Sequence, residues 1–205
     1  MGPMQIATSW ATLFLACAAI AGLTAAAAIC ARVTGYDDGP QPGTPPVVAL
    51  VAGAALIGGI AGAHSDSARL GLIAVVTAAF VAAWYCDVAR GIVPDVFSLG
   101  PMLLIAGLAF AWHDPRMVVS SLIVVVPFAI FAYLSRGRGM GWGDVKLAAV
   151  AGALLGASNA LLALALATFA AAVGAKLRRD AKNAPVAFAP YLIGATALFT
   201  AFTAL

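Results

Sequence analysis

The chain alternates long apolar runs with short polar connectors, and this pattern indicates its fold class. We count about eight apolar segments, at roughly 6–31, 47–63, 70–86, 97–112, 117–135, 144–156, 158–176 and 187–204. Several are long enough to cross a bilayer, which takes about 20 helical residues. Their Ala-, Leu- and Gly-rich sequences show no period-2 alternation, which argues against strands. The pattern predicts an all-α fold, a polytopic transmembrane helical bundle.

Two connectors add detail to this bundle. The longest, residues 35–46, is too rich in Pro and Gly to be helical and too short for a folded domain. Only Gly156 and Ala157 separate the sixth segment from the seventh. We expect the short sixth segment to enter from a loop and to form a tight helical hairpin with the seventh.

Composition supports a membrane protein and excludes nucleic acid as a partner. The 205 residues are 63% hydrophobic and only 9% charged, too little charge to cover a soluble domain of this length. The net charge of +3 is small, and the basic residues cluster in connectors. They therefore indicate topology and contact with membrane lipid.

The distribution of basic residues also predicts the orientation. Alternate connectors on one side carry nine of the 11 Lys and Arg residues, and the other side carries only Arg69 and Arg116. The positive-inside rule places the nine in the cytoplasm. Asp87 and the connector at residues 139–146 lie on this basic side.

The inventory of reactive side chains leaves an acid pair as the candidate chemistry. The chain has eight Asp and no Glu, which excludes an H-E-x-x-H metalloprotease. Both His residues fall on the opposite side, no G-x-S-x-G is present, and the three Cys form no C-x-x-C pair. We expect no metal and no other cofactor.

Two acids, Asp87 and Asp144, stand at the cytoplasmic ends of apolar segments. Two neighbouring carboxylates cannot both ionise cheaply, so one keeps a proton and the pair titrates as a unit. The ionised carboxylate takes a proton from water, and the protonated one polarises a carbonyl group. Such a pair is chemically sufficient for peptide hydrolysis.

Glycines directly precede the second acid, Asp144. Gly141 and Gly143 have no Cβ, so an extended peptide substrate could lie against their backbone. The alternative is a flexible loop that leads into a helix, with Asp144 as its N-cap. Spacing alone does not separate the two interpretations.

Three motifs resemble a known family. Residues 139–147, Gly-Met-Gly-Trp-Gly-Asp-Val-Lys-Leu, resemble the G-x-G-D signature of type IV prepilin peptidases, which are aspartic membrane proteases. Residues 87–95 resemble the family's first-aspartate segment, with Val93 before Pro94 and with Asp95 where Asn is usual. Residues 185–194 resemble its Pro-x-x-Phe-x-Pro-aromatic ending.

The resemblance implies a site and a reaction. Asp87 and Asp144 would be the catalytic pair. Gly141, Gly143 and Pro94 would shape the loops against which the substrate lies. The enzyme would remove the leader of a prepilin or pseudopilin at the cytoplasmic face of the bacterial inner membrane. Its substrate would be a single apolar helix with a cytoplasmic leader. Residues 70–205 would form the catalytic transmembrane core, and residues 1–69 would add transmembrane segments with a short cytoplasmic loop.

One departure narrows this expectation. Larger, bifunctional members carry paired C-x-x-C motifs in a cytoplasmic insertion linked to N-methylation, and the corresponding loop here has none. We expect peptidase activity without methylation, as in the small peptidases of tight-adherence (Flp) pilus systems. The alternatives are a presenilin-like intramembrane aspartyl protease, and a small ion- or proton-coupled transporter or pilus-assembly subunit.

Overall fold

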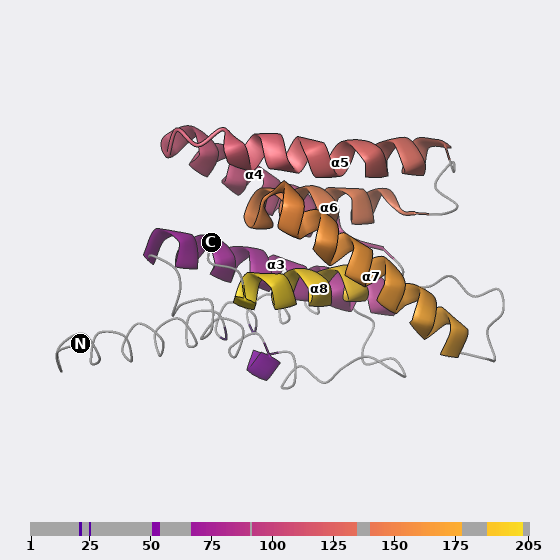
Figure 1. The fold of residues 1–205 in the computed structure, drawn as a ribbon. Coiled ribbons are helices and arrows are strands. Elements are labelled where there is room, and N and C mark those ends of the chain that lie inside the picture. Colours follow the sequence, from indigo (N-terminus) through magenta and orange to yellow (C-terminus); the bar gives the residue numbers. More distant parts are fainter. Residues whose placement is uncertain are drawn as a thin grey trace.

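The computed structural model describes residues 67–90, 92–134, 140–177 and 188–202, and the isolated positions 21, 25 and 51–53. Its long described ranges form six helices, and no strand occurs among the described residues. They are α3 (Ser67–Arg90), α4 (Asp95–Ala111), α5 (Arg116–Leu134), α6 (Trp142–Leu155), α7 (Ala157–Leu177) and α8 (Ala189–Phe202) (Figure 1).

The all-α prediction is confirmed for this part of the chain. The last six expected apolar segments correspond to α3–α8, with ends that differ by a few residues. The first two, at 6–31 and 47–63, fall almost wholly outside the described residues. The count of about eight is therefore not confirmed, and the division at residue 69 stays a prediction.

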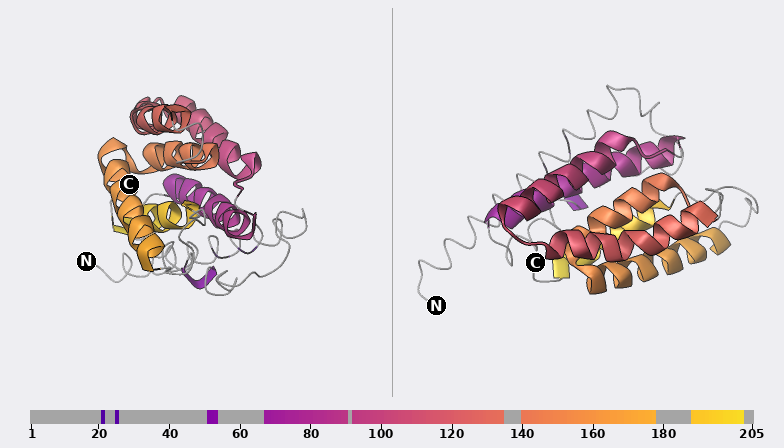
Figure 2. Two further views of the ribbon diagram at one scale, coloured as in Figure 1. Left: turned by 90° about the vertical axis from the view of Figure 1, so that its right-hand side faces the viewer. Right: turned by 90° about the horizontal axis from the view of Figure 1, so that it is seen from above.

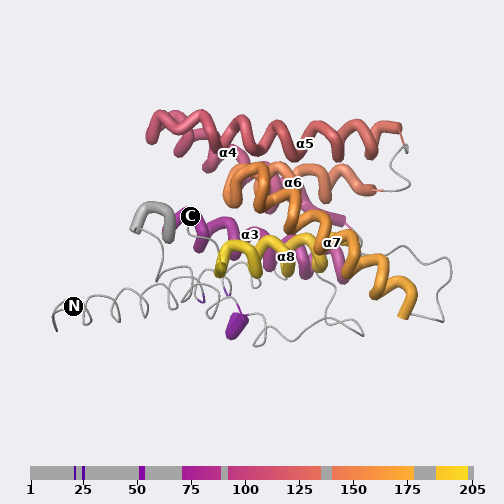
Figure 3. The backbone as a smooth tube through the Cα atoms, viewed as in Figure 1, coloured from indigo at the N-terminus to yellow at the C-terminus, as the bar shows by residue number. Residues whose placement is uncertain are grey.

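Successive helices run in opposite directions, as the chain path in Figure 3 makes clear. One end of the bundle, at the right in Figure 1, gathers the last turns of α3, α5 and α7 and the first turns of α4, α6 and α8. We call this the site end, because it brings together Asp87 near the end of α3 and Asp144 in the first turn of α6.

Helix α6 lies at the centre of the bundle. It contacts each of the other described helices, and the end-on view in Figure 2 shows it between α5 above, α7 at one side and α3 and α8 below. Nine of its 14 residues are buried. At about 1.5 Å per residue, such a helix is roughly 21 Å long, less than the hydrocarbon core of about 30 Å. Its enclosure by protein makes a full crossing unnecessary.

Three helices are long and apolar enough to cross a membrane: Gly71–Val88 of α3, Arg116–Leu134 and Ala157–Leu177. The α3 segment is 61% buried, whereas α5 and α7 are only 11% and 22% buried. Large apolar side chains such as Phe131 and Phe169 are exposed on these two helices. Exposed apolar surface of this extent is typical of helices that contact lipid, and α5 and α7 carry it in the described part of the chain.

A single residue joins α6 to α7. Gly156 has φ +77° and ψ 161°, a backbone region that only glycine occupies without strain. The chain therefore reverses within one residue and forms the tight hairpin expected from the sequence.

Close packing of α6 against α5 yields the first prediction. A Cβ on Gly152 would lie 2.9 Å from Val124 Cβ and 3.0 Å from the backbone oxygen of Ser120. We expect Gly152→Ala to lower the free energy of unfolding by about 1–3 kcal/mol, because backbone cannot yield as a flexible side chain can. Thermal unfolding in detergent micelles measures the change.

Gly107→Ala in α4 is the matched control, because no described atom lies within 4 Å of a Cβ placed on Gly107. Ala is the better helix former by about 1 kcal/mol, so this variant should be neutral or more stable than wild type. Equal unfolding midpoints for the two variants would contradict the packing at Gly152.

Candidate active site

Asp87 is a buried carboxylate one turn before the end of α3. The residue is 9% exposed. The backbone N–H of Ala189, the first residue of α8, donates a hydrogen bond to its carboxylate. The Oδ2 atom is buried and has no hydrogen-bond partner among the residues that the structure describes. Buried polar atoms are nearly always paired, so this oxygen is an exception within the protein.

Helix α8 is held in place to make this contact. A Cβ on Gly174 of α7 would lie 2.2 Å from the Tyr191 hydroxyl oxygen, so the Tyr191 ring lies directly against the α7 backbone. The N–H of Ala189 belongs to the first turn of α8, where backbone donors lack partners within the helix. The carboxylate of Asp87 therefore satisfies one of them and meets the positive end of the helix dipole.

Asp144 occupies the third position of α6. The N-cap is Gly141, with φ −74° and ψ 149°, so the alternative that Asp144 itself is the N-cap is wrong. The Gly141 backbone N–H donates to the Asp144 carboxylate instead. This is the return arm of a capping box, in which the third residue reaches back to the N-cap. It holds the carboxylate over the helix start.

The structure brings the two acids within electrostatic reach of each other. Burial, chiefly, and then the charge of Asp87 raise the pKa of Asp144 from 3.8 to about 6, against the opposing hydrogen bond from Gly141. Asp144 consequently exchanges its proton close to neutral pH. Such shifts are typical of sites that perform acid–base chemistry.

Gly143 sets the distance between the segments that carry these acids. A Cβ at this position would lie 2.7 Å from Val93 Cβ, in the connector that joins α3 to α4. Val93 thus fills the space beside Gly143 in which the sequence suggested a substrate. A Cβ on Gly141 would lie 3.5 Å from Asp144 Oδ2, which is ordinary van der Waals contact, so among the described residues nothing crowds this glycine.

Pro94 fixes the other end of this connector. It is buried and serves as the N-cap of α4, with φ −62° and ψ 140°. Its backbone oxygen accepts a hydrogen bond from the Phe97 N–H at 3.1 Å. Its position agrees with the loop-shaping role expected from the sequence, although its part in catalysis stays a prediction.

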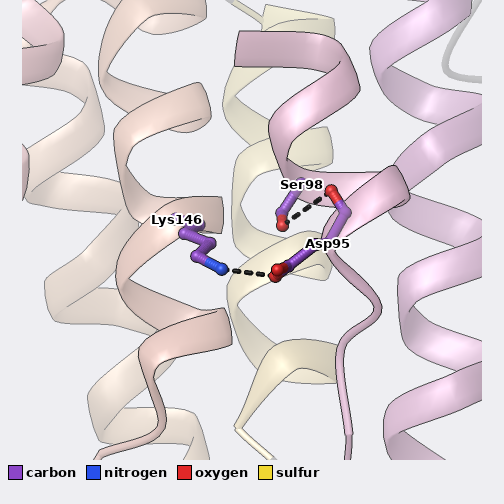
Figure 4. A network of polar contacts seen from close by, with 3 residues as sticks. All are labelled: Asp95, Ser98 and Lys146. Carbon is purple, nitrogen blue, oxygen red and sulfur yellow. Dashed lines mark hydrogen bonds and ion pairs between the residues drawn. The ribbon is translucent and has the colours of Figure 1, made fainter.

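Sequence reasoning missed an ion pair beside the acids. Figure 4 shows Lys146 of α6 reaching to Asp95, the first residue of α4, where the Ser98 hydroxyl donates to the Asp95 backbone oxygen at 3.3 Å. The pair joins α4 to α6 next to the contact between Val93 and Gly143. The only sign of it in the sequence was Asp95, which stands where the family usually has Asn.

A cavity of ≈ 560 Å³ opens beside Asp144. It is lined by Pro127, Phe128, Phe131, Met140, Asp144, Thr168, Ala171, Ala172, Ala175 and Phe188. A smaller cavity of ≈ 240 Å³ lies near the connector from α4 to α5, at the end of the bundle away from both acids. Among the described residues, no group of three or more His, Cys, Asp or Glu side chains could hold a metal ion.

Comparison with known proteins identifies the family. Residues 73–176, just over half of the chain, match the model of the type IV leader peptidase family, and this stretch contains both acids. The protein belongs to that family. It is accordingly a protease of the leader-peptidase type, whose substrates are in general prepilin-like. No curated protein and no solved structure matches the chain.

The raised pKa of Asp144 predicts how stability depends on pH. The folded protein holds this proton up to about pH 6, whereas the unfolded chain releases it near 3.8. The resulting stabilisation is fully present below about pH 4 and is lost as the pH rises through 6. The unfolding midpoint of wild type, relative to Asp144→Asn, should therefore fall across this interval.

Asp114→Asn, in the connector at the far end of the bundle, controls for the loss of an acid as such. Its unfolding midpoint should follow that of wild type from pH 4 to 8. A constant difference between wild type and Asp144→Asn over the same interval would show that Asp144 does not titrate as proposed.

The ion pair between Asp95 and Lys146 gives a third prediction. The side chains of Lys146 and Asp95 are 28% and 66% exposed, so water and salt screen the pair. A double-mutant cycle with Asp95→Ala and Lys146→Ala should give a coupling free energy of about 0.2–1 kcal/mol that shrinks at high salt. A coupling of zero at low salt would mean that the two side chains do not interact in solution.

Proposed function

We propose that this protein is an aspartic-type endopeptidase that removes the leader of type IV prepilin-like proteins, with Asp87 and Asp144 as its catalytic pair. The observation that carries the proposal is that buried Asp87 and half-buried Asp144 lie at one end of the bundle, within electrostatic reach of each other. Asp87 has an oxygen without a partner among the described residues, and Asp144 has a pKa of about 6. Both lie inside the stretch that matches the leader peptidase family.

The pair supplies both halves of a peptide hydrolysis. The ionised carboxylate removes a proton from water, and the resulting hydroxide attacks the scissile carbonyl carbon. The protonated carboxylate donates to the carbonyl oxygen as negative charge develops there. The C–N bond then breaks, and the leaving nitrogen takes up a proton from the pair. Because the two acids share one proton, the roles belong to the pair and not to a fixed residue.

The distribution of basic residues supports cleavage at the cytoplasmic face of the bacterial inner membrane. Lys146 and Lys176 lie at the site end, and most other basic residues fall in connectors that lead to it. By the positive-inside rule, this end faces the cytoplasm. A substrate with its helix in the bilayer and its leader in the cytoplasm would present the scissile bond at this level.

The loop that corresponds to the cytoplasmic insertion of the larger members is residues 31–46, which include the Pro- and Gly-rich connector 35–46. This loop supports a peptidase that does not methylate its product. Its sequence has no C-x-x-C pair and too few residues for a folded insertion, and its structure lies outside the described residues. In this respect the chain resembles the small peptidases of Flp pilus systems.

Loss of leader cleavage tests the proposal. We expect wild type, co-expressed with a prepilin, to shorten it, and Asp87→Asn and Asp144→Asn each to lower the cleavage rate at least about 10²-fold, because Asn keeps the size but cannot exchange the proton. Electrophoretic mobility of the pilin, at equal abundance of each variant in the membrane, is the measurement.

Asp114→Asn should cleave at the wild-type rate. Retained cleavage by either candidate variant would remove that acid from the catalytic pair. If wild type cleaved no member of a prepilin panel, the function would be wrong, and proton- or ion-flux assays would test the transporter alternative. Cleavage in the middle of the apolar helix would favour the presenilin-like alternative.

A further inference from the structure

The cavity beside Asp144 is an elongated groove between the two lipid-facing helices. Its α7 side consists of Thr168, Ala171, Ala172 and Ala175, and its α5 side of Pro127, Phe128 and Phe131. The α7 positions follow the spacing i, i+3, i+4 and i+7, so they share one face over about two turns, roughly 10 Å. Met140, Asp144 and Phe188 line its site end. We call this cavity the α5–α7 groove.

The lining selects an apolar occupant. Asp144 is the only charged residue among the described residues that line the groove. The hydroxyl of Thr168 already donates to the Leu164 backbone oxygen at 2.8 Å, so it has no hydrogen left for a ligand. Large side chains project from α5, and small ones leave room along α7. A volume of ≈ 560 Å³ accommodates several side chains of a bound segment.

The groove also has a direction. Ala175 lies near the end of α7 at the site end, and Thr168 lies two turns further from it. On α5, Phe131 lies closer to the site end than Pro127. The groove therefore leads from Asp144 away from the site end, along helices whose outer surfaces face lipid.

We propose that the α5–α7 groove binds the apolar residues that directly follow the scissile bond of the substrate. This inference rests on the proposed function. The basic leader continues out of the site end, whereas the apolar helix of the mature protein continues into the bilayer, and only the latter matches the groove in chemistry and direction. The small side chains of Ala171, Ala172 and Ala175 then determine which apolar side chains fit behind the cleavage site.

Filling the groove tests the assignment. In Ala172→Phe the new ring occupies space that the substrate needs, and we expect KM for a full-length prepilin in detergent or proteoliposomes to rise about 10–200-fold. The value of kcat should change little, because the two acids are untouched. Replacing the first apolar residues after the scissile bond by Ala should restore cleavage by the variant towards the wild-type rate.

Val173→Phe is the matched control. Val173 is the next residue on α7, is exposed and does not line the groove. It should leave KM unchanged.

Three outcomes separate the inference from the function on which it rests. If wild type cleaves and the two Phe variants behave alike, the groove is not the binding site, although the protease assignment stands. If the alanine-substituted substrate does not restore cleavage by Ala172→Phe, the loss of cleavage reflects distortion of the protein, and the groove assignment is overturned. If wild type cleaves nothing, the protease assignment fails and the groove assignment with it.

Discussion

The enclosure of α6 by every other described helix is the constraint on which the rest of the structure depends. A helix of 14 residues is too short to span the hydrocarbon core, so its backbone and side chains must be surrounded by protein. The tight approach at Gly152 and the one-residue turn at Gly156 make this enclosure possible on two sides. Because Asp144 stands in the first turn of this central helix, burying the helix also partly buries the acid.

Placing two carboxylates at a partly buried position is unfavourable unless backbone donors accompany them. Each acid receives one such donor from a helix start: Asp87 from Ala189, and Asp144 from Gly141. This support is incomplete, since Asp87 keeps one oxygen without a partner among the described residues. That oxygen still has its capacity to accept a hydrogen bond, whereas a carboxylate that only caps a helix has its acceptors satisfied.

Local sequence patterns were enough to predict most of the helices. The apolar runs gave α3 to α8 within a few residues, because length and apolar content decide which segments enter lipid. The two acids stood out because Asp87 follows one apolar run and Asp144 begins another, in a chain with few charges. Contacts between distant segments could not be read in the same way. Neither the position of Val93 against Gly143 nor the bond from Ala189 to Asp87 has a local signature, and the pairing of Asp95 with Lys146 was visible only as two unexplained residues.

The position of α8 has a consequence for how small a working version of this protein can be. The stretch that matches the family, residues 73–176, includes both acids and ends within α7. Helix α8 lies beyond it, yet its first N–H is the donor that Asp87 receives, and its Tyr191 rests on the α7 backbone at Gly174. A chain cut after α7 would keep both acids in its sequence but would lose the backbone support of one of them. The smallest chain that keeps this support therefore extends past the matched stretch and into α8.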